Sequence, residues 1–157
     1  MASLSYRRSA IQMHTLRSAL FAALTGMYLL AQAAELPQVH LQIGLRYVQA
    51  EVAATPDSRS TGLMHRTELG KNQGMLFVFD GTQTQAMWMR NTLIPLSVAF
   101  MDEQGVIINI AEMQPQTETV HASTAPARYA LEMNAGWFAN VGVKPGDKIK
   151  GLPRRSE

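Results

Sequence analysis

The feature that most restricts the fold of this chain is a series of short strand-like segments separated by turn residues. Apolar and polar residues alternate from Leu41 to Tyr47, and the alternation continues in the opposite phase from Val48 to Val52. A period of two that changes phase predicts two strands or a β-bulge, here near Gly44. Met75–Phe79 is apolar at every position, which predicts a central strand buried on both faces. The chain is therefore expected to be mainly β.

Turn residues indicate how the later strands are connected. Leu96–Met101 and Val106–Ile110 flank Asp102–Gly105, a combination that predicts a β-hairpin. Asp80-Gly81 predicts a turn after the central strand, so that Gln85–Met89 pairs back as the next strand. The remaining predicted strands are Tyr129–Met133 and Asp147–Leu152, the second entered through the Pro145-Gly146 turn.

Two short helices are expected between the strands. Thr55-Pro56-Asp57 offers an N-cap, a proline at the first helical position and an acid in the first turn, so a helix should run to about Met64. Ala135–Val141, followed by Gly142, predicts a second helix, and the polar stretch Met113–Ala127 predicts a long loop. We expect residues 34–157 to form a single β-rich α+β domain, an antiparallel sandwich or partly open barrel with two short helices.

The first 33 residues have the composition of a secretory signal peptide. Their charges are Arg7, Arg8 and Arg17, and 17 uncharged residues follow from Ser18 to Ala34. Ala31-Gln32-Ala33 supplies the small-residue pattern of a cleavage site, so we predict cleavage near Ala33 and a periplasmic or secreted domain. A retained membrane anchor is the alternative, but a spanning helix needs about 20 apolar residues. The membrane is thus expected to matter only during export.

Charge and cysteine content exclude several functions. The chain carries a formal net charge of +2, but three of its 14 basic residues and none of its 12 acidic residues lie in the predicted signal peptide. Residues 34–157 are left with a net charge of −1, and only the tail from Lys144 to Arg155 is locally basic, so we predict no nucleic-acid partner. The absence of cysteine excludes disulfides, thiolate metal sites and cysteine nucleophiles. No cofactor is predicted.

Several motifs resemble a known family. They are, in chain order, Arg59-x-x-Gly62-Leu63-Met64, Gly74-Met75-Leu76-Phe77-x-Phe79, Trp88-Met89-Arg90-Asn91-Thr92-x-Ile94-Pro95-Leu96, Tyr129-x-Leu131-Glu132, Ala135-Gly136 and Gly146-Asp147. This series is similar to the family called domain of unknown function 192, from about Glu51 to Ile149. The resemblance implies a bacterial or archaeal domain, often exported, and it implies no activity because the family has no assigned reaction.

The polar residues of these motifs are the candidate ligand-binding site. If Arg59, Arg66 and Arg90 converge, their guanidinium groups would form an anion site with bidentate donors. Asn91 and Thr92 add amide and hydroxyl groups that suit a sugar or a carboxylate.

A purely structural role for the same residues is the competing interpretation. Arg90 could pair with Glu132, Arg59 could pair with Asp57, and Asn91 could fix a turn, because most such ion pairs are structural or solvated.

These residues leave three functions open, and no catalytic residue is assigned. The first is non-catalytic binding of a small polar or anionic ligand, or of an envelope protein, by Arg59, Arg66, Arg90, Asn91, Thr92 and Glu132. The second is an enzyme that acts on an envelope glycan or polymer with Glu132 as acid or base, where Glu112 or Asp80 could be the second carboxylate. No Gly-x-Ser-x-Gly motif is present, and the spacing of His40, His65 and His121 does not favour zinc.

The third function is Cu(I) binding through Met87, Met89 and His65. Thioether ligands select Cu(I), and alternation along a strand would place both methionines on one face with Trp88 on the other. Methionines in apolar runs are also ordinary core residues, which is the competing explanation.

Overall fold

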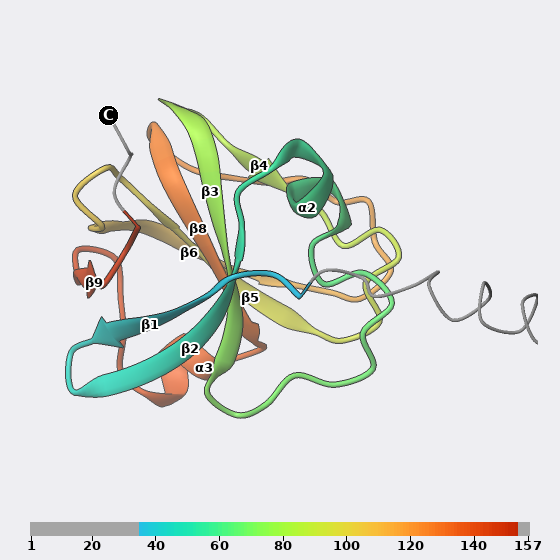
Figure 1. Cartoon of the computed structure of the whole chain (residues 1–157), viewed down its shortest axis with the longest axis horizontal. Coiled ribbons are helices and arrows are strands. Elements are labelled where there is room, and N and C mark those ends of the chain that lie inside the picture. The colour runs from blue at the N-terminus through green and yellow to red at the C-terminus, as the bar shows by residue number, and fades with distance from the viewer. Residues whose placement is uncertain (1–34, 154–157) are drawn as a thin grey trace, which may run out of the picture. The chain divides into compact units, whose positions relative to one another are not determined.

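The computed structural model describes residues 35–153, which form nine strands and two short helices (Figure 1). The predicted signal peptide lies outside the described residues. None of the helices in the described part is long and apolar enough to cross a membrane. The elements are β1 (Gln38–Ile43), β2 (Arg46–Ala53), α2 (Pro56–Thr61), β3 (Gln73–Gln83), β4 (Ala86–Met87), β5 (Leu96–Met101), β6 (Ile107–Met113), β7 (His121–Ala122), β8 (Ala127–Asn134), α3 (Trp137–Asn140) and β9 (Ile149–Lys150).

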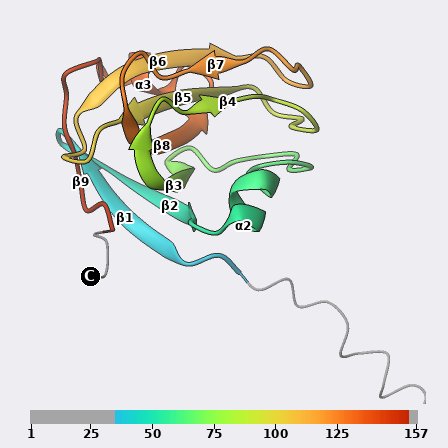
Figure 2. The same ribbon diagram turned by 90° about the horizontal axis from the view of Figure 1, so that it is seen from above.

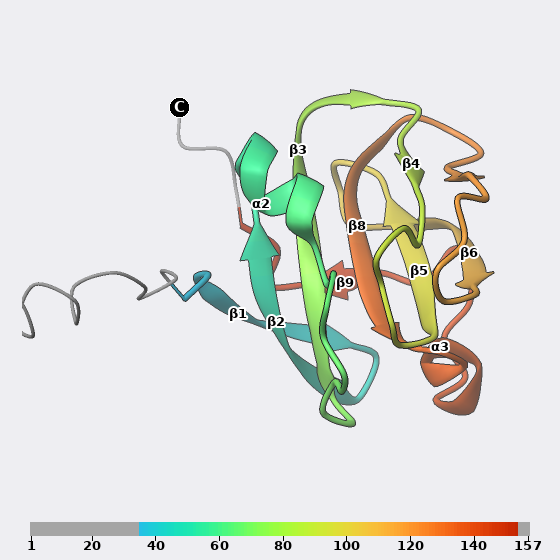
Figure 3. The same ribbon diagram turned by 90° about the vertical axis from the view of Figure 1, so that its right-hand side faces the viewer.

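Seven of the strands form one curled sheet, in the order β6-β5-β8-β3-β2-β1-β9 (Figure 3). Neighbouring strands are antiparallel except β2 and β3, which run parallel because α2 lies in the connection between them. A single bridge between Val106 and Lys148 joins the start of β6 to the segment before β9, and the Ile149 N–H donates to the Gly105 carbonyl at 2.9 Å. The two edges of the sheet therefore meet at one point, and the predicted partly open barrel with two short helices is confirmed.

Each face of this sheet carries its own hydrophobic cluster, because side chains alternate between the faces along every strand. The first cluster includes Leu76, Leu131 and the two aromatic residues of α3, Trp137 and Phe138. The second cluster lies on the opposite face and includes Met75, Phe77, Val98, Phe100 and Ala130. The elements that cover this second face, α2 and the β4 segment, determine where a cavity can form.

The start of α2 follows the prediction, and its end is earlier. The Thr55 hydroxyl accepts a hydrogen bond from the Ser58 N–H at 3.1 Å, while the Ser58 hydroxyl accepts one from the Thr55 N–H, which completes a capping box. The helix stops at Thr61 instead of Met64 because Gly62 adopts a φ of +47°, a value that most residues avoid. At this glycine a Cβ would lie 3.2 Å from the Phe77 ring, so the turn also permits close packing.

Two predictions about the middle of the chain are wrong. Asp80-Gly81 is not a turn, because β3 continues through it to Gln83 with a register shift after Val78. Gln85–Met89 does not pair back with the central strand, which is flanked by β2 and β8 instead. Its only strand residues in the described part of the chain are those of β4, which pairs with β7 in a separate two-stranded sheet (Figure 2). The predicted loop Met113–Ala127 contains β7 and is therefore partly ordered as a strand.

Three further predictions of secondary structure agree with the structure, whereas the last strand and the second helix are shorter than predicted, at Ile149–Lys150 and Trp137–Asn140. The phase change near Gly44 marks the turn between β1 and β2, which form an antiparallel hairpin. The strands β5 and β6 form the expected hairpin around Asp102–Gly105. Gly142 follows α3 with a φ of +75°, as expected of a glycine at the end of a helix.

Candidate functional site

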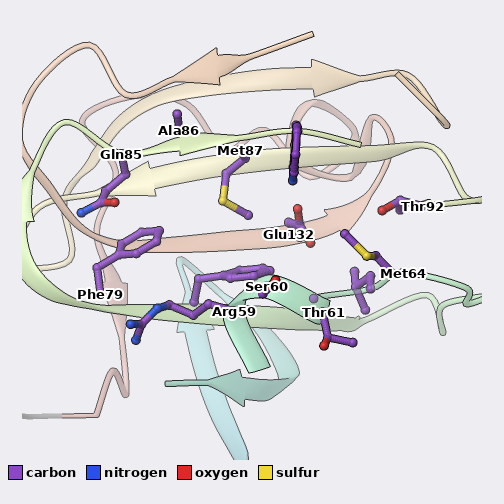
Figure 4. Close-up of a pocket in the computed structure, with 14 residues that line it drawn as sticks. Arg59, Ser60, Thr61, Met64, Phe79, Gln85, Ala86, Met87, Thr92 and Glu132 are labelled. Atoms are coloured by element: carbon purple, nitrogen blue, oxygen red, sulfur yellow. The ribbon is translucent and has the colours of Figure 1, made fainter. Parts of the chain in front are cut away.

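A cavity of about 310 Å³ lies on the second face of the sheet, between α2, β3, the β4 segment and β8 (Figure 4). Its side chains come from segments far apart in the sequence, and Glu132 lies in the middle of them, between Met87 above and α2 below. The lining residues are Arg59, Ser60, Thr61, Gly62, Leu63, Met64, Phe77, Phe79, Gln85, Ala86, Met87, Trp88, Thr92 and Glu132.

Glu132 is the acidic residue of this lining and the most unusual group in it. It lies on β8, opposite Met75 of β3 and Val98 of β5, so its immediate neighbours in the sheet are apolar. The residue is only 3% exposed, and it lines the cavity; no fully buried side-chain oxygen or nitrogen of residues 35–153 lacks a partner, so the Glu132 carboxyl is not a sealed, unpaired group. Burial raises the pKa of Glu132 to about 8, because the charged form loses its hydration.

The consequence is a carboxyl group that keeps its proton at neutral pH. A protonated carboxyl can donate one hydrogen bond through its O–H and accept others through its carbonyl oxygen. Buried acids with strongly displaced pKa values in concave sites are candidates for binding or proton transfer. Glu132 thus has the chemistry of a polar anchor at the base of a partly apolar cavity.

Arg59 also lines the cavity, but its guanidinium group is already bonded elsewhere. It donates to the carbonyl of Ala54 at 2.7 Å, to the carbonyl of Val78 at 2.9 Å and to the carboxylate of Asp80 at 2.6 Å. Its ion-pair partner is therefore Asp80 and not Asp57. In Figure 4 the guanidinium points away from Glu132, so this arginine fastens α2 to β3 and is not aimed at the cavity.

The other two candidate arginines are separate from Arg59 and from each other. Arg66 makes a two-point ion pair with Glu51 at 2.5 and 2.6 Å, and hydrogen bonding to that carboxylate raises its pKa. Arg90 lies 3.7 Å from Glu118 and places its guanidinium carbon 5.7 Å from the centre of the Trp88 ring. Neither lines the cavity. The three guanidinium groups form three different ion pairs and do not converge, and Arg90 does not pair with Glu132.

Asn91 and Thr92 lie beside the cavity, with different roles. Asn91 adopts a φ of +56°, which marks a tight turn, and its carbonyl accepts the His65 N–H at 2.9 Å. Thr92 is 5% exposed and contributes to the lining, and its hydroxyl donates to the Arg90 carbonyl at 3.4 Å. Of the six predicted ligand-binding residues, the structure brings Arg59, Thr92 and Glu132 to one cavity.

The predicted Cu(I) ligands are divided among different environments. Met87 lines the cavity, Met89 is fully buried in the second hydrophobic cluster, and His65 is exposed outside the lining. Met64 contributes a second thioether to the lining in their place. Within residues 35–153, no three His, Asp or Glu side chains are grouped as a metal site would require.

Neither predicted second carboxylate shares the cavity with Glu132. Glu112 accepts hydrogen bonds from the Ser97 hydroxyl at 2.7 Å and from the Gly136 N–H at 3.1 Å, so it has a structural role. Asp80 is held by Arg59. Glu132 therefore has no acidic partner on the lining.

Sequence reasoning missed several lining residues, above all Phe77, Phe79 and Met64. An apolar residue beside a cavity has the same sequence pattern as one that fills a core, so the two are indistinguishable in a strand. All three belong to the motifs that carry the family resemblance, and their place in those motifs could have pointed to a role at the site.

Two solved structures resemble this chain over most of its length. A protein from Sinorhizobium meliloti 1021, described as a candidate transcription regulator, is 36% identical with a TM-score of 0.68, over 73% of this chain and 92% of that one. A protein of unknown function from Novosphingobium aromaticivorans DSM 12444 is 34% identical with a TM-score of 0.68, over 76% of this chain and 89% of that one.

The comparison with curated proteins gave no match. The family model that matches, DUF192, is described as "Uncharacterized ACR" and covers residues 39–151. That range is most of the chain and contains every motif quoted above. The chain therefore belongs to the DUF192 family of uncharacterised domains.

Proposed function

We propose that this domain binds a small polar ligand in the cavity above Glu132 and catalyses no reaction on it. The observation that carries the proposal is a carboxyl group that is 3% exposed, lines a cavity and has its pKa raised by burial. Ligand sites are typically concave and largely apolar, with a few polar groups that fix orientation. The lining of Phe77, Phe79, Met64 and Met87 around Glu132 has this composition.

The energetic cost at Glu132 comes from lost hydration. Burial removes water from the ionised carboxylate, which is why the pKa of this group is raised. A glutamine or leucine at position 132 would avoid the cost of burying an ionisable group. A ligand that bonds to the carboxyl from the cavity would offset this cost on binding, which is the expected arrangement in a binding site.

An enzyme that uses Glu132 as acid or base is the second candidate. Its raised pKa suits proton transfer near neutral pH. Paired-carboxylate glycoside hydrolysis, however, needs a second acid across the scissile bond. The lining offers none, so binding is favoured.

We do not extend to this chain the description of the S. meliloti protein as a transcription regulator. DNA binding relies on neutralising several phosphates with clustered Lys and Arg. Three arginines of the described part are each paired with an acid, and residues 34–157 carry a net charge of −1.

A pair of matched variants tests whether the cavity binds ligands. Thr61 lines the cavity and Thr67 does not, and both threonines are exposed. We expect amide chemical shifts of lining residues to move when a set of sugars, amides, amines and carboxylates is titrated into the protein. Thr61→Trp should abolish the changes by filling the cavity, whereas Thr67→Trp should preserve them. Changes that survive Thr61→Trp, or no changes with any compound, would refute the proposal.

Export is part of the proposal, based on the signal-peptide composition of residues 1–33. The domain would then meet its ligand, or an envelope protein, outside the cytoplasm. Fractionation of cells that produce the full chain should find a shortened protein in the periplasm or medium, beginning near Ala34. A full-length protein confined to the cytoplasm would contradict this part of the proposal.

A further inference from the structure

We infer that the ligand of this cavity is a small organic cation, an alkylammonium or quaternary ammonium compound, held by the carboxylate of Glu132 and the aromatic side chains around it. This inference rests on the proposed function and specifies its ligand class. It follows from the charges on the lining, from the aromatic walls and from the protonation of the buried acid.

The charges on the lining favour a positive ligand. Glu132 and Arg59 are the two residues with charged side chains on it. Arg59 is satisfied by Asp80 and two backbone carbonyls, and it points away from Glu132. An anionic ligand would meet the carboxyl group without an available cation. An ammonium group would place a positive charge beside the carboxyl of Glu132, which Arg59 does not do because it is paired with Asp80.

The walls of the cavity suit the same ligand. Phe77, Phe79 and Trp88 contribute aromatic rings, and the faces of such rings attract cations. Trp88 already holds a cation in this way, because the Arg90 guanidinium carbon lies 5.7 Å from its ring centre. Aromatic cages are a known solution for recognising quaternary ammonium groups.

Binding of a cation should displace the proton of Glu132. Burial holds the pKa of Glu132 near 8, so at pH 6.5 the free protein carries the carboxyl as the neutral acid. Ion pairing with an ammonium favours the carboxylate, so the O–H bond breaks and the proton passes to the buffer.

No histidine and no second acid of the described residues lines the cavity beside Glu132. Met75 and Val98 face it from the adjacent strands, and neither titrates. On α2 the charged group is Arg59, which is paired. On the β4 side, His121 lies opposite Met87 in the two-stranded sheet but outside the lining.

The test compares choline with its uncharged isostere, 3,3-dimethylbutan-1-ol, by calorimetry at pH 6.5 and constant ionic strength. Butylammonium is titrated as a second cation. We expect at least one cation to bind about tenfold or more tightly than the isostere, because both an ion pair and a ring contact are added. Repeating the titration in two buffers with different ionisation heats should reveal release of close to one proton per cation bound.

Glu132→Gln is the matched variant, because glutamine keeps the size and hydrogen-bonding capacity but carries no charge. It should lose the preference for the cation and the proton release, and its circular dichroism spectrum establishes that it folds. Equal affinities for cation and isostere, or cation binding without proton release in the unmodified protein, would overturn the inference. If the isostere binds as tightly as the cations and Thr61→Trp blocks it, the cation inference falls while the proposed binding function stands. If none of the sugars, amides, amines and carboxylates changes the amide chemical shifts of the lining residues, the proposed function itself falls.

Discussion

Replacing Glu132 with glutamine should change how the stability of this protein depends on pH. The residue is 3% exposed, lies among apolar side chains and has a pKa of about 8 in the native state against 4.5 for a free glutamate. Between these two values the native state keeps the proton, whereas the unfolded chain has released it. Rising pH therefore favours the unfolded state until Glu132 is ionised in both.

The size of the effect follows from the gap between the two pKa values. Each pH unit between 4.5 and about 8 corresponds to about 1.4 kcal/mol, so the loss of stability approaches about 5 kcal/mol above pH 8. Typical domains have unfolding free energies of about 5–15 kcal/mol, so the contribution of this one group is large. The burial cost of glutamine does not depend on pH. Glu132→Gln should therefore gain stability relative to the parent protein steadily from pH 4.5 to pH 8 and level off above it.

The assay is urea denaturation of the parent protein and the variant at intervals from pH 4 to pH 9.5. Other titrating groups affect both curves alike, so the difference between the two free energies isolates Glu132. Glu68→Gln, at an exposed position, is the control and should give a difference independent of pH. A flat difference for Glu132→Gln, or one that grows towards low pH, would refute the assignment of a buried neutral acid.

Three further predictions concern the frame around the cavity, each measured as a change in unfolding free energy by denaturation. Arg59→Ala removes a 16% exposed guanidinium that is bonded to two carbonyls and an acid, so we expect it to lower the unfolding free energy by about 1–3 kcal/mol. Asp80→Asn changes an 81% exposed side chain and should cost less than about 1 kcal/mol. Equal losses for the two variants would contradict a structural role for the hydrogen bonds from Arg59 to the carbonyls. Gly105→Ala should cost about 3 kcal/mol or more, because its Cβ would lie 2.6 Å from a backbone oxygen at a φ of +79°. Gly142→Ala, at a φ of +75° with open space around it, should cost only about 1–2 kcal/mol. If Gly142→Ala costs more than Gly105→Ala, close packing of Gly105 against Ile149 is ruled out. Thr55→Ala should cost about 1 kcal/mol by removing the cap of α2, and an unchanged stability would mean that the capping box contributes nothing in solution.

Much of the fold was predictable because the relevant interactions are local. The hairpin of β5 and β6 is defined by alternation and turn residues within one short segment, and the Thr55 cap depends on a neighbour three positions away. The pairing of the strands was less predictable. Gln85–Met89 follows the central strand directly, yet its Ala86 and Met87 pair with β7, more than thirty residues later. Local propensity contains no information about which distant edge a short strand will meet.

The candidate site was also predictable only in part. Motif positions identified Arg59, Thr92 and Glu132 as polar groups to examine, and all three line one cavity. The ion-pair partners of the arginines were not predictable, since Arg59 meets Asp80 twenty-one positions away and not its neighbour Asp57.

The sequence by itself determined that this chain forms a β-rich, cysteine-free domain of the DUF192 family with an acid embedded in an apolar strand. Only the tertiary structure decided that this acid faces a cavity, that no second carboxylate joins it and that Arg59 is turned away. The physical reason is that hydration and pairing of a carboxyl group depend on which side chains surround it in space. The pKa of Glu132 is therefore a property of the packing of β3, β5 and β8 and of the elements that cover them.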